Sequence, residues 1–294
     1  MNRADIAALL ALGAALFIAI GDVMHQRSAH EVTEEKVGHL DLFLRLLKDT
    51  GWWMGSAVAA IGFILQAAAL GFGSVLLVQA LLVTALLFAL PINARLTHRR
   101  VTRWEWTWAA LLAASVAVIV IVGNPTEGHS RASLETWTLV IAVLGPLLVL
   151  CVVAAGMLSG PISAVLLAIV SGALWGLFAV LTKGVVDLLG HGIWRLTRAP
   201  ELYAWAAVGV AGTAWQQSSF RAGALTASLP TMTVTEPIVG SSLGVVVLGE
   251  TLRPGEAGWF TLAVAVAAMV VSTVALARGE AVASAAVQSE LPGR

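Results

Sequence analysis

The sequence predicts an all-α fold: a polytopic membrane helix bundle with about nine transmembrane helices in an inverted repeat of five plus four. Composition is the first observation behind this prediction. Of 294 residues, 59% are hydrophobic and only 12% are charged, and the mean hydropathy is +0.89. A soluble domain carries about 25% charged residues. This chain therefore cannot cover a water-facing surface.

An internal repeat is the second observation. The stretch Gln66-Ala-Ala-Ala-Leu-Gly-Phe-Gly73 has a counterpart in Gln216-Gln-Ser-Ser-Phe-Arg-Ala-Gly223. At nearly the same offset, Glu105-Trp-Thr-Trp108 matches Glu256-Ala-Gly-Trp259. A weaker match sets Leu16-Phe17 and His25 against Leu174-Trp175 and Lys183. Duplicated spans build many secondary transporters, whose substrate site lies between the repeats near the bilayer midplane.

A spanning helix needs about 20 mostly apolar residues. The segments that meet this condition are 4–26, 52–71, 74–96, 103–122, 136–156, 162–186, 201–220, 225–249 and 256–277. The first could instead be a signal peptide, because Arg3 precedes an apolar run. That run continues into Gly21-Asp22 without a small-residue cleavage site, and it matches the sixth segment. We therefore interpret it as a span.

The repeat divides the chain into residues 1–157, with five spans, and residues 158–278, with four. Residues 279–294 are expected to form a disordered tail, because they are small and polar. An odd number of spans separates the start of one unit from the start of the next. The second unit should therefore cross the membrane in the opposite sense, and the fifth span has no partner.

Basic residues predict the orientation. Nine spans place eleven of the 17 Lys and Arg residues on the side of the C-terminus. The densest group is Arg95, Arg99, Arg100 and Arg103, in one short loop. Because Lys and Arg concentrate in cytoplasmic loops, we expect the N-terminus outside and the C-terminus in the cytoplasm, in a bacterial cytoplasmic (inner) membrane.

The pattern resembles the drug/metabolite transporter superfamily, including its EamA-like members. The residues that carry the resemblance are the repeated units after the second and seventh spans, and Leu248-Gly249-Glu250-Thr251-Leu252, which is similar to that family's G-E-x-L turn. The first repeat lacks the acid and reads Asn93-Ala-Arg-Leu96. The nine-span count and Phe17-Ile-Ala-Ile-Gly21 are closer to the NIPA-type magnesium transporter branch. The resemblance implies a duplicated helical transporter, but superfamily members move many kinds of solute, and a fold does not choose among them.

Glu236 is the leading candidate for a functional residue, because it lies near the middle of the eighth predicted span. An ionised carboxylate there costs about 2.5–3.5 kcal/mol on insertion scales. Pro230 and Pro237 flank it and should kink the helix. A midplane acid could couple proton entry to substrate release. The alternative is a protonated Glu236 that donates a hydrogen bond to carbonyls freed by the prolines.

Other polar and aromatic residues inside spans are candidates for a substrate site. Thr231 and Thr235 share one helix face with Ser228. The alternative is that each hydroxyl only donates a hydrogen bond to a carbonyl of the preceding turn of its own helix. Amides rarely enter lipid-facing helices, and their alternative role is hydrogen bonding between helices. Trp175 and Trp215 could wall a cavity or fill the core. The remaining candidates are Gln66, Gln79, Gln216 and Gln217.

Three residues near the ends of spans are candidates for gating. Asp22 and His25 lie toward the cytoplasmic end of the first predicted span, and Lys183 lies toward the outer end of the sixth. In an inverted repeat these positions fall at opposite mouths of a pathway, so Asp22 and Lys183 should not pair. Interfacial placement and snorkelling of the lysine are the alternatives.

The predicted function is a secondary transporter that moves a small organic solute, metabolite or lipid-like molecule by alternating access. Glu236 is expected to couple this transport to protons. We expect no enzyme, cofactor, metal site or nucleic-acid partner, because no nucleophile–base pair, phosphate loop or Cys/His ligand spacing is present and Cys151 is alone. Substrate and lipids are the expected partners, and a homodimer is left open. The alternatives are a magnesium transporter, for which one midplane acid is a thin ligand supply, and a non-transporting membrane scaffold.

Overall fold

A computed structural model of the chain describes residues 2–32, 50–96, 100–222, 225–255 and 258–289. Its elements are helices, in the order α1 (Arg3–Val32), α3 (Thr50–Phe72), α4 (Val75–Leu82), α5 (Ala85–Leu96), α6 (Arg103–Gly123), α7 (Leu134–Met157), α8 (Pro161–Gly190), α9 (Ile193–Arg198), α10 (Pro200–Ala222), α11 (Leu225–Leu248) and α12 (Gly258–Ser289). The all-α prediction is confirmed for this part of the chain.

Within the described residues, 8 helical stretches are long and apolar enough to span a bilayer. They coincide with eight of the predicted spans, and α4 and α5 together form one of them. The predicted span 201–220 coincides with α10, a helix of 23 residues that packs along α8. Its Gln, Ser and Glu residues make α10 less hydrophobic than the other 8 stretches. The ninth span therefore stays a prediction.

Local sequence explains where several helices begin. Thr102 and Glu105 form a capping box at the start of α6, since each side chain accepts a hydrogen bond from the other residue's backbone N–H. The hydroxyls of Ser74 and Ser133 cap α4 and α7. The cap of α6 follows the predicted arginine-rich loop, of which residues 97–99 lie outside the described part.

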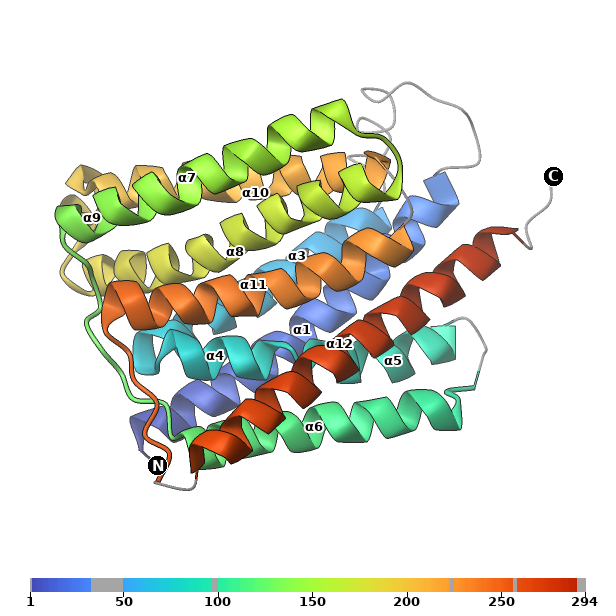
Figure 1. Cartoon of the computed structure of the whole chain (residues 1–294), viewed down its shortest axis with the longest axis horizontal. Helices are drawn as coiled ribbons and strands as arrows, with labels where there is room; N and C mark the ends of the chain where they lie inside the picture. Colours follow the sequence, from blue (N-terminus) through green and yellow to red (C-terminus); the bar gives the residue numbers. More distant parts are fainter. Residues whose placement is uncertain (1, 33–49, 97–99, 223–224, 256–257, 290–294) are drawn as a thin grey trace.

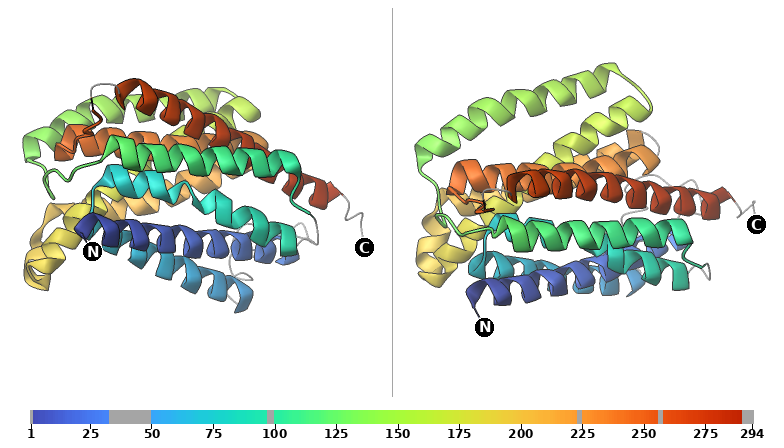
Figure 2. Two further views of the ribbon diagram at one scale, coloured as in Figure 1. Left: turned by 90° about the horizontal axis from the view of Figure 1, so that it is seen from below. Right: turned by 60° about the horizontal axis from the view of Figure 1, so that its bottom comes forward.

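The helices run roughly parallel to one another along the length of the bundle (Figure 1). Helix α1 packs along α3, α8 lies between α10 and α11, and α12 packs along α6 and α11. Helix α7 packs mainly on α8 and lies at the outer edge of the bundle in both further views (Figure 2). The centre of the bundle is therefore the contact of α4 and α8 with α11.

The third predicted span is interrupted where α4 gives way to α5. The N–H of Thr84 donates to the carbonyl of Leu81 at 3.0 Å, and the N–H of Leu87 donates to Thr84 at 2.9 Å. These three-residue steps replace the four-residue steps of an α-helix, as in a 3₁₀ turn, which in mid-helix often marks a hinge. The interruption falls near the centre of the span Val75–Leu96.

Glycines allow α11 to approach its neighbours closely. A Cβ at Gly176 of α8 would lie 2.7 Å from the carbonyl oxygen of Glu236, and one at Gly172 would lie 2.9 Å from Cβ of Thr235. On another face of α11, a Cβ at Gly240 would lie 2.7 Å from Nε2 of Gln79 in α4. Small residues spaced in this way let membrane helices touch backbone to backbone. Helix α11 is thus fixed between α8 and α4.

Candidate functional site

The candidate site lies in the seam, our name for the contact of α4 and α5 with α11 and α12. Seam residues come from both halves of the chain, and we define them as Gln79, Val83, Thr233, Pro237, Gly240, Met269 and Thr273. A small pocket opens there between Val83 at the helix interruption, Thr233 and Pro237 of α11, and Met269 and Thr273 of α12. An interrupted helix therefore faces a proline-containing helix across a pocket.

Two polar atoms of the seam are buried with no hydrogen-bond partner in the described structure: Nε2 of Gln79 and Oγ1 of Thr273. Their residues are 1% and 2% exposed. Neighbouring hydroxyls behave differently, since Thr233 donates to the carbonyl of Leu229 at 2.8 Å and Ser272 donates to Ala268. A buried polar group without a partner costs about 1–3 kcal/mol. Thr273 lines the pocket, so its hydroxyl is available to a bound molecule or water, whereas the amide of Gln79 is packed against Gly240 of α11.

Glu236 is half-buried on α11, one residue before Pro237. Its backbone faces α8, as the close approach of Gly176 shows, and the residue takes part in an interaction within the protein. Thr235 lies against Gly172 and donates its hydroxyl to the carbonyl of Thr231 at 2.7 Å. The structure therefore groups Glu236, Thr235 and half-buried Thr231 near the α8–α11 contact, beside the seam.

The remaining candidates are distributed over other contacts. Trp175 of α8 donates its indole N–H to Oε1 of Gln216 in α10 at 3.2 Å and packs edge-on against Phe178, at 5.2 Å between ring centroids. Gln66 is buried on α3, Trp215 is half-buried and Gln217 is exposed. Trp175 and Gln216 thus join α8 to α10, away from the seam residues. The side chains of Asp22 and His25 lie outside the described part of the structure.

Lys183 is buried and belongs to an ion pair that sequence reasoning missed. Its Nζ lies 3.0 Å from Oε1 of Glu250, and the two side chains are 5% and 0% exposed. Nζ also donates to the carbonyl of Gly73 at 2.8 Å. The carboxylate of Glu250 accepts the backbone N–H of Val75 at 2.7 Å and of Leu76 at 3.0 Å. We call these five residues the end clamp.

The charges of the end clamp match the dipoles of the helices they meet. The carboxyl end of α3 carries a partial negative charge and the amino end of α4 a partial positive charge. The ammonium of Lys183 meets the carbonyl at the end of α3, and the carboxylate of Glu250 meets the free N–H groups of α4. Two residues from the second half of the chain therefore hold the α3–α4 turn of the first half.

Two sequence signals could have identified this pair. A lysine inside a span needs a partner within the protein, because an unpaired charge in hydrocarbon is costly. An acid directly after a span is a natural partner, and Gly249, with φ of 66°, ends α11 so that Glu250 turns inward. The internal repeat aligns Lys183 with His25 and gives no sign of Glu250. The motif Gly249-Glu250 by itself indicates only a family resemblance.

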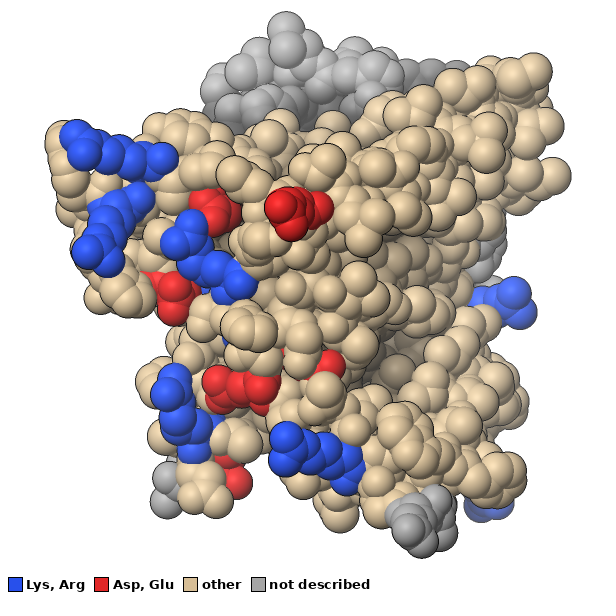
Figure 3. All heavy atoms as spheres, turned by 60° about the vertical axis from the view of Figure 1, so that its left-hand side comes forward, with Lys and Arg blue, Asp and Glu red and all other residues tan. Residues whose placement is uncertain are grey.

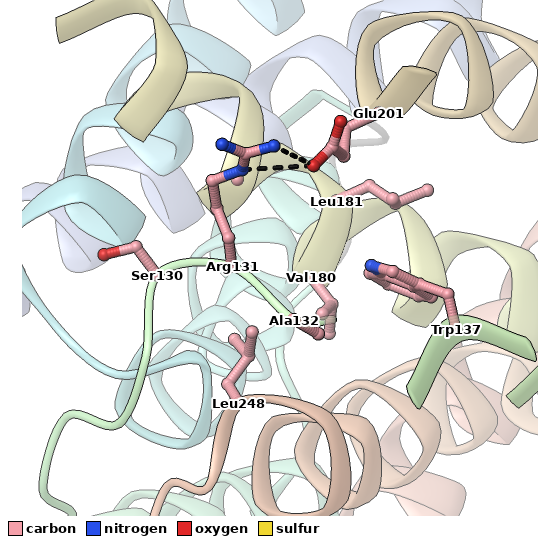
Figure 4. Close-up of a pocket in the computed structure, with 9 residues that line it drawn as sticks. Ser130, Arg131, Ala132, Trp137, Val180, Leu181, Glu201 and Leu248 are labelled. Carbon is pink, nitrogen blue, oxygen red and sulfur yellow. Dashed lines mark hydrogen bonds and ion pairs between the residues drawn. The ribbon is translucent and has the colours of Figure 1, made fainter. Parts of the chain in front are cut away.

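A strap, residues 124–133, crosses the bundle end beside the end clamp. Its N–H groups at Thr126 and His129 donate to the carbonyls of Thr251 and Leu248, at 2.9 Å and 2.7 Å. Arg131 then pairs with Glu201 of α10, and its Nε lies 3.1 Å from Oε1. A pocket remains between the strap, α8 and Leu248, with Trp137 at its side (Figure 4). Charged side chains gather on this end of the molecule (Figure 3).

Comparison with known proteins gives one substantial match. No known protein-family profile matches the chain, and no solved structure matches it. A protein of Corynebacterium glutamicum, whose name describes it as uncharacterized, is 39% identical over 278 residues. The matched region covers 93% of this chain and 95% of the relative. The similarity therefore extends over the whole helix bundle and not over one segment.

Proposed function

The chain belongs to the same family as the uncharacterized Corynebacterium glutamicum protein, and we propose that it is a secondary transporter of a small organic solute or lipid-like molecule. It is a multi-pass helical membrane protein by length and hydropathy of its helices. The observation that carries the proposal is the seam, in which an interrupted helix faces a proline-containing helix across a small pocket. The partnerless hydroxyl of Thr273 in α12 lines this pocket, and the partnerless amide of Gln79 is buried at the α4–α11 contact.

Interrupted helices near the membrane centre typically line the substrate sites of transporters. Irregular backbone at that depth is tolerated where protein or a cavity surrounds it. The seam combines the interruption at Thr84 with the prolines of α11, so both sides of the pocket have a place to bend. In our proposal the seam binds the solute, and Glu236, which is next to Pro237, couples its movement to a proton.

The inverted repeat of five plus four spans, with α10 as a membrane span, is part of this proposal. The pairing of α1 with α3 and of α8 with α10 supports it, because the corresponding first two helices of each unit pack along each other. The drug/metabolite transporter resemblance and the orientation with the C-terminus in the cytoplasm of a bacterial inner membrane belong to the proposal as well.

An uncharged, mostly apolar pocket favours an organic solute over a divalent cation. The described residues contain no group of three or more His, Cys, Asp or Glu side chains placed to hold a metal ion. The pocket lining is instead aliphatic side chains with Thr233 and Thr273. Such a lining suits a ligand with an apolar body and a hydrogen-bonding group. The pocket has room here for little more than a water molecule, so the helices must move apart to bind such a ligand.

The test is transport by the Glu236→Gln variant. Thermal-shift screening of amino acids, nucleosides, sugars, lipid fragments and Mg²⁺ on the purified protein first selects a substrate. In proteoliposomes with a proton gradient, the wild type should accumulate it. Glu236→Gln should keep exchange but lose accumulation, because the amide keeps the shape of the protonated acid and cannot release a proton.

Accumulation by Glu236→Gln at the wild-type rate would restrict Glu236 to a structural role. Selective movement of Mg²⁺ would favour the cation transporter instead. A wild-type protein that moves none of the panel, yet retains stable partners after purification, would favour the scaffold. As a matched control, Glu135→Gln makes the same substitution at an exposed acid of α7 and should leave transport unchanged.

A further inference from the structure

We propose that the end clamp is the closed gate of the transport pathway at its end of the bundle, with Lys183 and Glu250 as the gating pair. This inference rests on the proposed transporter function. Its basis is that the two charges join the α3–α4 turn of the first half to α8 and the end of α11 in the second half. Any opening between α4 and α11 at this end must break the hydrogen bonds from Lys183 to Gly73 and from Val75 and Leu76 to Glu250.

The clamp is continuous with the seam along one face of α11. A Cβ at Gly244 would lie 2.9 Å from Oε2 of Glu250, and a Cβ at Gly240 would lie 2.7 Å from Nε2 of Gln79. Gly244, Gly240 and Pro237 follow one another at helical spacings of four and three, so they share a face. The α4–α11 contact therefore leads from the clamp to the pocket.

An ion pair has the energetics that a gate requires. Burial of two charges costs several kcal/mol per ion, and their attraction and hydrogen bonds offset that cost only while the geometry is kept. When the end opens, water can hydrate both ions and return the desolvation cost. Apolar side chains in the same place would not be stabilised by water when the end opens. A charged clamp can thus be firm when closed and still be opened at modest cost.

The surroundings leave room for this movement. The strap covers the clamp through backbone hydrogen bonds to Leu248 and Thr251 and through the partly exposed Arg131–Glu201 pair. A pocket lies beneath the strap, between Arg131, Gly184 of α8 and Leu248 of α11 (Figure 4). The cover over the gating pair is therefore one segment of chain, and a small pocket separates part of it from α8.

The direction of the charges matters, as well as their presence. Glu250 faces N–H groups and Lys183 faces a carbonyl. The exchanged pair Lys183→Glu with Glu250→Lys would place an ammonium against N–H groups and a carboxylate against a carbonyl. The exchanged pair should therefore not close this end of the bundle. A pair of surface charges, in contrast, can usually be exchanged without losing its attraction.

The test is access of a thiol reagent to the seam, which needs no substrate. Cys151→Ser removes the natural thiol, and Val83→Cys places one in the seam pocket, where residue 83 is buried. A membrane-impermeant maleimide is applied to sealed vesicles of each orientation. Glu127→Cys, on the exposed strap, reports which face of the vesicle carries the clamp.

With the clamp intact, Val83→Cys should label slowly from the clamp side. In Lys183→Met with Glu250→Gln, labelling from that side should rise by about tenfold, the population change given by about 1.4 kcal/mol. Labelling from the opposite side should not rise. The control Arg131→Gln with Glu201→Gln, which neutralises the partly exposed pair of the strap, should change the clamp-side rate far less.

Unchanged clamp-side labelling in a folded double variant would show that the pair is only a structural brace, as would an equal rise from both sides. If that variant does not fold, Glu250→Asp keeps the charge, shortens its reach and should raise clamp-side labelling by a smaller factor. The labelling test involves no solute, so increased clamp-side labelling would support the gate even if Glu236→Gln transports normally. Likewise, unchanged labelling would reject the gate without affecting the proposed role of Glu236 in proton coupling.

Discussion

The middle and the end of α11 each carry an acid, and the structure treats the two differently. Glu236, in the middle, is half-buried beside two prolines. Glu250, just past the end, is fully buried, pairs with Lys183 and accepts two backbone N–H groups of α4. The acid at the end is thus committed to closed-state contacts, whereas the acid in the middle keeps partial exposure. Position along one helix separates an acid that is held by several contacts from an acid that stays partly exposed.

The largest expected effect comes from breaking the pair at the end. Glu250→Ala should destabilise the protein by about 3–5 kcal/mol, because it leaves the ammonium of Lys183 buried without compensation. Glu236→Gln should cost under about 1 kcal/mol, since it keeps shape and hydrogen bonding. Unfolding in mixed detergent micelles, followed by tryptophan fluorescence and circular dichroism, measures both. Equal losses would remove the distinction between the two acids.

The next effect concerns the close packing in the middle of α11. Gly176→Ala should cost about 1–3 kcal/mol, because its Cβ would lie 2.7 Å from backbone atoms of both Glu236 and Gly240. Gly156→Ala in α7 is the matched control, since nothing lies within 4 Å of its Cβ position. The control should be neutral or slightly stabilising through helix propensity. Equal melting temperatures for the two variants would contradict the tight α8–α11 contact.

A smaller effect separates the two caps of α4. Ser74→Ala removes the hydroxyl that accepts the N–H of Leu77 at 3.1 Å and should cost about 1 kcal/mol. Glu250, from far along the chain, satisfies the N–H groups of Val75 and Leu76 and should therefore matter more. The same unfolding assay ranks the two substitutions. A larger loss for Ser74→Ala would make the local cap, and not the clamp, the support of the α3–α4 turn.

The smallest effect is expected at the surface. Arg131→Gln removes a pair with Glu201 in which the arginine side chain is 42% exposed and the glutamate side chain is 14% exposed. Exposed pairs contribute about 0–1 kcal/mol and weaken with salt. The change in melting temperature should be small at low salt and smaller still at high salt. A loss comparable to that of Glu250→Ala would show that the strap, and not the clamp, holds this end closed.

The sequence predicted some residues near the candidate site, and other features of the seam are visible only in the structure. Glu236, Gln79 and the prolines of α11 come from the sequence, because polar or helix-breaking residues inside apolar runs are conspicuous. The interruption between α4 and α5 was not predicted, since Leu-Leu-Val-Thr-Ala contains neither Gly nor Pro. Thr273 also escaped notice, because hydroxyls in spans usually bond to their own helix, and only the assembled seam leaves this one without a partner.

By itself, the sequence determined that the chain forms apolar helices and placed their approximate boundaries. Those features depend on the length of apolar runs, on caps such as Thr102 with Glu105, and on local helix chemistry. Only the tertiary structure decided which charges meet. Lys183 and Glu250 are 67 residues apart in the chain, and they meet at the α3–α4 turn because helix packing, and not any local rule, brings the turn, α8 and the end of α11 together.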